Sequence, residues 1–206
     1  RMHEGCNARV WVQAKCKGGD ISVEQGTQLL TRLAGTGSAH ISPNSSEYDK
    51  AMAEKPAVFE TMHDAILCPA HNEIKFYTWG DDECCLPKGA TQATLTDDST
   101  DRLRLRPGDV LIFGEVRNPE TGLANEKNPN HRHAVRLTKV YPEAELVRSS
   151  ETATPHLQIK EASPGVPQTK FDPLNNQPIV SIEWAVEDAL PFCLCLRQVE
   201  DPPGSG

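Results

Sequence analysis

The chain has 206 residues, a formal net charge of −8 at pH 7 and a pI near 5.4. This acidic balance argues against a nucleic-acid partner, because nucleic-acid grooves need clustered Lys and Arg. No apolar run approaches the roughly 20 residues of a spanning helix, so we expect no membrane span. Hydrophobic residues make up 37% and aromatic residues 5% of the chain, which predicts a folded protein with a thin core and many loops.

The length predicts one domain or, at most, two small lobes. We interpret residues 1–206 as a single β-rich domain. The alternative is a division into two lobes, about 1–100 and 101–206. Because the chain begins with Arg1 and ends in Asp-Pro-Pro-Gly-Ser-Gly, we expect an internal piece of a longer protein.

Alternation of apolar and polar residues, which is typical of half-buried strands, recurs along the chain. It occurs at residues 8–16, 72–79, 133–140, 178–184 and 192–196. In the last of these segments, Leu194 alternates with Cys193 and Cys195, so the leucine and the thiols should face opposite sides. Residues 109–116 are apolar on both faces, which predicts a central strand.

Turns that contain glycine or proline separate these strands, at residues 17–20, 87–89, 106–109 and 118–122. Short strands with frequent turns predict a mainly β fold: a sandwich or barrel-like domain with long polar loops and little helix. A short helix is predicted at residues 47–55 and a single helical turn at 186–190.

Three long polar segments interrupt the predicted strands, at residues 34–50, 117–131 and 149–178. Ordering such segments costs conformational entropy. We therefore expect them to be mobile in the isolated chain and to fold against a partner. The predicted core consists of Val10, Val12, Leu29, Phe59, Ile74, Phe76, Leu95, Leu111, Phe113, Val135, Leu137, Ile182, Phe192 and Leu194.

The chain contains seven cysteines, an odd number, and no Cys-x-x-Cys pair. This usage favours free, buried thiols in a reducing compartment over a disulfide framework. Cys193 and Cys195 should lie about 6.5–7 Å apart along one strand, which suits packing better than shared ligation. We therefore predict no structural disulfide and no stoichiometric zinc.

Two groups of histidines resemble metal-binding patterns. His131 and His133 form an HxH pair at the start of a strand, as in cupin-type metal barrels, and His63, Cys68 and His71 lie close in sequence. In cupins, however, the HxH segment precedes the Pro-Gly-Asp turn, and here that turn comes first. The sequence thus predicts no metal ligand and no cofactor, with a metal-dependent, cupin-like β-barrel enzyme as an alternative.

No assembled catalytic set stands out. Asp81, Asp82 and Glu83 precede the Cys84-Cys85 pair, and this acidic run should raise the pKa of the thiols and disfavour a nucleophile. We interpret these acids, and the Asp97-Asp98 pair, as solvated turn residues. The sequence has no Walker, GxSxG, HExxH or GxGxxG motif, so we predict no catalytic residues and no enzyme.

Four aromatic residues, Trp11, Tyr77, Trp79 and Trp184, lie on predicted strands. Such residues can form a platform that binds sugars, so a carbohydrate-binding β module is a second alternative. Because aromatic residues are scarce in this chain, we expect the core to need most of them.

The segment FYTWGDDECCLPKGATQATL at residues 76–95 resembles the baseplate assembly proteins of phage-tail-like contractile injection systems, of the baseplate-J or wedge type. Further stretches are similar to the same family in the same order. They are residues 7–13, 26–32, 58–61, 105–122, 131–140 and 188–196, with gaps in the polar segments.

The resemblance implies a bacterial structural protein that contributes to baseplate assembly and to the attachment of sheath and tube. Its implied partners are other baseplate and wedge subunits and hub or sheath proteins, and it implies neither catalysis nor a cofactor. The implied location is the cytoplasm, within a phage-tail-like particle that cells can release.

Overall fold

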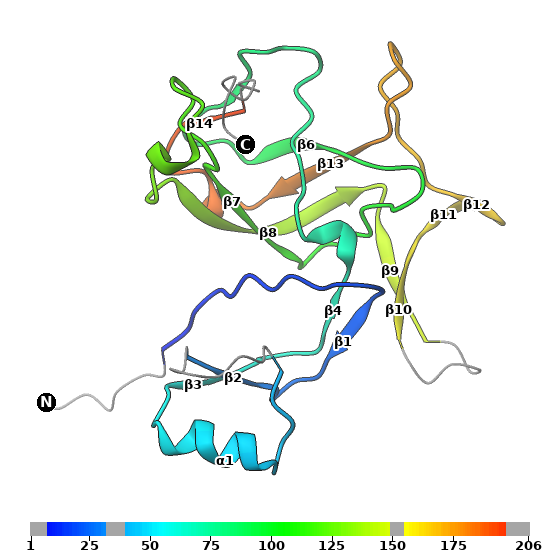
Figure 1. The fold of residues 1–206 in the computed structure, drawn as a ribbon. Helices are drawn as coiled ribbons and strands as arrows, with labels where there is room; N and C mark the ends of the chain where they lie inside the picture. Colours follow the sequence, from blue (N-terminus) through cyan, green and yellow to red (C-terminus); the bar gives the residue numbers. More distant parts are fainter. Residues whose placement is uncertain (1–7, 32–39, 149–154, 197–206) are drawn as a thin grey trace, which may run out of the picture.

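The structure, a computed structural model, describes residues 8–31, 40–148 and 155–196. Strands account for 33% and helices for 10%, so the prediction of a mainly β fold with little helix is confirmed. Figure 1 shows two parts, one built around the helix and one around the largest sheet. We call residues 8–67 the N-terminal region and residues 85–196 the sheet region. None of the helices in these described ranges is long and apolar enough to cross a membrane.

The N-terminal region contains two short antiparallel strand pairs and the α-helix. β1 (Ile21–Val23) pairs with β4 (Ala65–Leu67), and β2 (Gln28–Leu30) pairs with β3 (Val58–Glu60). The helix α1 (Ser46–Ala53) begins where the Ser45 side chain accepts a hydrogen bond from the Tyr48 amide. The short helix predicted at 47–55 is therefore present.

The sheet region is built on a four-stranded antiparallel sheet with the order β6-β13-β8-β7. Its strands are β6 (Gln92–Thr96), β7 (Val110–Gly114), β8 (Arg132–Tyr141) and β13 (Ile179–Trp184). Three further antiparallel pairs flank it: β5 (Cys85–Leu86) with β14 (Leu194–Cys195), β9 (Ala144–Val147) with β10 (His156–Ile159), and β11 (Glu161–Ser163) with β12 (Val166–Pro167). β6 lies before residue 100 and its partner β13 lies after it, so this sheet contains strands from both sides of residue 100.

Three short 3-10 turns complete the described elements: η1 (Pro69–His71), η2 (Ala124–Glu126) and η3 (Val186–Asp188). The last of them matches the helical turn predicted at 186–190. In the predicted turn at 106–109, Gly108 has a φ of 95°, a conformation that side-chain-bearing residues rarely adopt. This turn directs the chain into β7.

The main core lies on the sheet. Val135 and Leu137 of β8 and Val180, Ile182 and Trp184 of β13 are buried. Alternation along β8 leaves Arg136 and Thr138 exposed, as the period of two predicts. The predicted core residues Leu95, Phe113, Val135, Leu137, Ile182 and Leu194 are buried, and Ile74, Phe76, Leu111 and Phe192 pack partly buried against them.

Some of the predictions are wrong. Val10, Val12 and Leu29 are exposed by 57%, 55% and 37%, because residues 8–16 form no named strand and β2 has only the short β3 as a partner. The segment 72–79 makes a single β-bridge, Phe76 to Leu95, instead of a strand. β7, predicted as central, is an edge strand that pairs with β8 alone.

The polar segments differ in structure. Residues 117–131 form a loop that is largely hydrogen-bonded to itself: the Asn118 side chain accepts from the Glu120 and Thr121 amides, and the Asn128 side chain accepts from the Asn130 amide. Of 149–178, residues 149–154 lie outside the described residues, and the remainder contains β10, β11 and β12 instead of one long loop. In the segment 34–50, residues 34–39 lie outside the described residues, and residues 46–50 belong to α1.

Candidate functional site

A broad groove of about 1020 Å³ runs between the N-terminal region and the sheet region. Its walls include Trp11 and Ile66 on one side and Phe76, Leu111 and Arg136 on the other. The guanidinium of Arg136 lies 5.6 Å from the centre of the Trp11 ring, a cation–π contact. Apolar side chains make up most of the groove lining, together with several charged ones, among them Lys75, Arg106 and Arg117.

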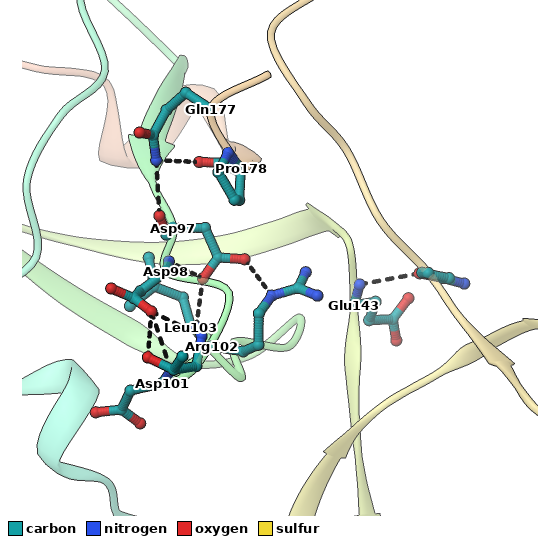
Figure 2. A network of polar contacts seen from close by, with 10 residues as sticks. Asp97, Asp98, Asp101, Arg102, Leu103, Glu143, Gln177 and Pro178 are labelled. Atoms are coloured by element: carbon teal, nitrogen blue, oxygen red, sulfur yellow. Dashed lines mark hydrogen bonds and ion pairs between the residues drawn. The ribbon is translucent and has the colours of Figure 1, made fainter. Parts of the chain in front are cut away.

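The Asp97-Asp98 pair belongs to a structural network. Asp97 is only 3% exposed, and its carboxylate accepts from Arg102 Nε at 2.5 Å and from the Leu103 amide at 2.7 Å. Figure 2 shows this network, with Gln177 donating to the Asp97 carbonyl oxygen at 2.9 Å. The expectation that Asp97 is a solvated turn residue is wrong, because burial and the ion pair with Arg102 hold it at the end of β6.

Asp98 is exposed, in agreement with the turn interpretation. Its carboxylate accepts hydrogen bonds from the Thr100 amide and hydroxyl and from the Asp101 amide. Hydrogen bonding by Thr100 lowers the pKa of this carboxyl from its ordinary value. Because both carboxylate oxygens of Asp97 and the Oδ1 of Asp98 accept local hydrogen bonds, the pair stabilises the turn rather than serving acid–base chemistry.

The HxH histidines have separate local partners. His131 Nδ1 lies 2.7 Å from Glu115 Oε2, and its ring stacks on Phe192 with centroids 4.6 Å apart. His133 Nε2 lies 3.1 Å from the Asp188 carbonyl oxygen. These contacts hold His131 against Glu115 and Phe192 and hold His133 against η3, so the two rings do not converge on a shared ligand position.

The histidines and the cysteine at 63–71 do not form a metal site either. Cys68 is buried, and burial raises its pKa to about 11. Burial, followed by the charge of Arg104, lowers the pKa of His71 to about 4. His63 is exposed, whereas His71 Nε2 is buried without a hydrogen-bond partner. His71 therefore stays neutral at pH 7 at the junction of the two regions.

The four aromatic residues do not form one platform. Trp184 is buried and contacts Phe113 edge to face, with ring centroids 5.2 Å apart. Tyr77 contacts the exposed Trp79 and donates its hydroxyl to Asp172 Oδ2 at 2.5 Å. The Trp184 ring is thus part of the core, and Trp11 lies elsewhere, against Arg136.

Three thiols come together on the surface, which the sequence analysis missed. The sulfur atoms of Cys85, Cys193 and Cys195 lie within 4.8 Å of one another, and all three residues are exposed. The alternation along 192–196 correctly placed Leu194 inside and the two cysteines on the opposite side. The expected separation of about 6.5–7 Å between Cys193 and Cys195 is wrong for their sulfur atoms, because the two side chains incline toward each other. The expectation of buried thiols holds for Cys16 and Cys68 but is wrong for this cluster.

The pKa values of Cys85 and Cys193 are raised. For Cys85 the main cause is its hydrogen bond with Cys195, and for Cys193 it is burial. At neighbouring Cys84, burial and then the charge of Asp81 raise the pKa, in the direction predicted from the acidic run. Protonated thiols are poor nucleophiles, so this arrangement does not suit cysteine catalysis.

Comparisons with protein-family models, curated proteins and solved structures found no match.

Proposed function

We propose that this chain is a structural, non-enzymatic baseplate component of a phage-tail-like contractile injection system, of the wedge type. It would contribute to baseplate assembly and to the attachment of sheath and tube, and its partners would be other baseplate and wedge subunits and hub or sheath proteins. It would assemble in the cytoplasm into a particle that cells can release.

The observation that carries the proposal is that four of the seven family-like segments form one unit around the largest sheet. Residues 76–95 supply β5 and β6, residues 105–122 supply β7, residues 131–140 make up most of β8, and residues 188–196 supply β14. β7 pairs with β8 and β5 with β14, and β6 and β8 both pair with β13. Segments that resemble one family in sequence thus pair directly or through one shared strand, which supports a common origin of the unit.

The surface supports a role in assembly. Large apolar side chains project from loops and turns, among them Val116, Leu174 and Val186, which are 74%, 92% and 73% exposed. Exposed apolar groups of this size are typical of surfaces that a partner covers.

The direct test is deletion of the gene in cells that produce such particles, followed by negative-stain microscopy. We expect complete contractile particles to disappear and to return when the intact gene is supplied in trans. Normal particles from the deletion strain would contradict the proposal. A catalytic role would instead leave particle number unchanged and alter only what the particles do.

A loop variant tests one contact surface. The loop at 117–131 is our first choice, because it carries both signs of charge and joins β7 to β8. Replacing residues 119–129 by Asn-Gly should lower the yield of complete particles. Because most of the described bonds of this loop are internal, the melting temperature of the isolated chain should fall only slightly. Normal particles that still contract would exclude this loop as the contact.

A further inference from the structure

The three-thiol cluster is positioned by the pairing of β5 with β14. Cys85 and Cys195 are direct partners in the antiparallel register, with their sulfur atoms 2.8 Å apart. Cys193 lies two residues before Cys195 and therefore projects from the same face of the strand. Two strands that are 110 residues apart in sequence thus present three sulfur atoms to one point.

The scaffold beneath the thiols is fixed by the core. Leu194, between the two cysteines, is 3% exposed, and its partner Leu86 packs against the same hydrophobic cluster. The Leu196 amide donates to the Cys84 carbonyl oxygen at 2.8 Å, next to the strand pair. The cluster is consequently preorganised, because the side chains that alternate with the cysteines cannot turn outward without exposing apolar surface.

We propose that Cys85, Cys193 and Cys195 form a binding site for a thiol-seeking metal ion, with Zn²⁺ as the ion that fits best. Zn–S bonds of about 2.3 Å in a tetrahedral arrangement place sulfur atoms about 3.8 Å apart. The observed sulfur atoms lie within 4.8 Å of one another, so small side-chain rotations bring all three to that spacing. Binding exchanges three S–H protons for three S–Zn bonds and releases those protons to solvent.

The number of thiols distinguishes this site from a simple disulfide. A bond between Cys85 and Cys195 would use two of the thiols and leave the convergence of Cys193 unexplained. Three protein ligands leave the fourth position of zinc open, and the exposure of all three cysteines makes that position accessible to water. The inference does not depend on the proposed baseplate role, which is tested by particle yield rather than by metal binding.

The test is a zinc titration of the purified chain, freed of metal and kept reduced, against a chromophoric chelator. We expect one zinc ion per chain, and Co²⁺ in its place should give sulfur-to-cobalt charge-transfer absorption. Cys85→Ser, Cys193→Ser and Cys195→Ser should each weaken zinc binding at least about tenfold. Cys84→Ser is the matched control, because Cys84 adjoins the site but lies outside the cluster, and it should bind zinc like the unaltered chain.

Protection from alkylation provides a second measurement that needs no variant. Zinc should slow the reaction of Cys85, Cys193 and Cys195 with iodoacetamide, as located by mass spectrometry, and leave Cys84 unaffected. The proposal is overturned if the reduced chain binds no zinc, if Cys84→Ser weakens binding as much as the other variants, or if a Cys85–Cys195 disulfide persists in reductant. Circular dichroism of the metal-free variants separates loss of a ligand from loss of the fold.

Discussion

The strand β8 and the segment at residues 8–16 have the same alternating sequence pattern but different structures. The strand β8 has a partner on each side, β13 and β7, and its Val135 and Leu137 are buried. The segment at 8–16 has no strand partner among the described residues, and Val10, Trp11 and Val12 are more than half exposed. Alternation therefore indicates which side chains share a face, whereas burial depends on a neighbouring strand that the local sequence does not specify.

The test with the largest expected loss of stability replaces one tryptophan in each region. Trp184→Ala should destabilise the chain by about 3–5 kcal/mol, because it leaves a cavity against Phe113. Trp11→Ala should cost less than about 1 kcal/mol, since Trp11 is 55% exposed and contacts Arg136 through a cation–π interaction. Denaturant unfolding monitored by circular dichroism measures both. Equal losses would show that residues 8–16 contribute to the core.

The next largest effect concerns the polar network at the end of β6. Asp97→Ala removes the partner of Arg102 and the acceptor for the Leu103 amide, so it should cost about 3 kcal/mol. Asp98→Ala is the control, because Asp98 is exposed and bonds only within its turn, and its effect should be clearly smaller. Thermal unfolding of the two variants compares them directly. A larger loss at Asp98 would contradict the structural role assigned to Asp97.

These two tests concern features that the sequence revealed to different degrees. The strands β8 and β13 were predictable, because their apolar residues alternate over a long run. The burial of Asp97 was not, because adjacent acids look the same in a solvated turn and in a buried ion pair. The thiol cluster was half predictable: alternation placed Cys193 and Cys195 on one face, but Cys85 reaches them only through a strand pairing that no local pattern encodes.

His71 provides a test by pH at the junction of the two regions. Its folded-state pKa of about 4 lies below the ordinary value of 6.5, because burial and the charge of Arg104 disfavour the protonated ring. The unfolded chain therefore binds the proton first as the pH falls. The free energy of unfolding should decrease from pH 6.5 towards pH 4, by about 3 kcal/mol in total.

The window between pH 5 and 6.5 is the most informative, since most carboxylates stay ionised there. His71→Leu should flatten the stability profile in this window, as measured by denaturant midpoints at several pH values. His63→Leu is the matched control, because His63 is exposed, and it should keep the slope. An unchanged slope in His71→Leu would mean that another group accounts for the pH dependence.

The smallest expected effect compares two ion pairs. Arg104 donates from Nη1 and Nη2 to the two carboxylate oxygens of Asp20, at 2.7 and 2.9 Å, and so joins the sheet region to the N-terminal region. Lys139 and Glu183 pair across β8 and β13 at 2.8 Å, with side chains 73% and 47% exposed. The first pair is two-pronged and partly buried, whereas the second is solvated and held by a single contact.

Double-mutant cycles should therefore give a coupling energy of about 1 kcal/mol for Arg104–Asp20 and less than about 0.5 kcal/mol for Lys139–Glu183. High salt should reduce the second value more, because solvent-exposed charges are screened most strongly. Arg104→Met should also increase proteolysis within the N-terminal region while the sheet region stays resistant. Equal coupling energies would show that partial burial does not strengthen the Arg104–Asp20 pair. Cleavage first within β8 or β13 would show that this ion pair does not hold the N-terminal region against the sheet region.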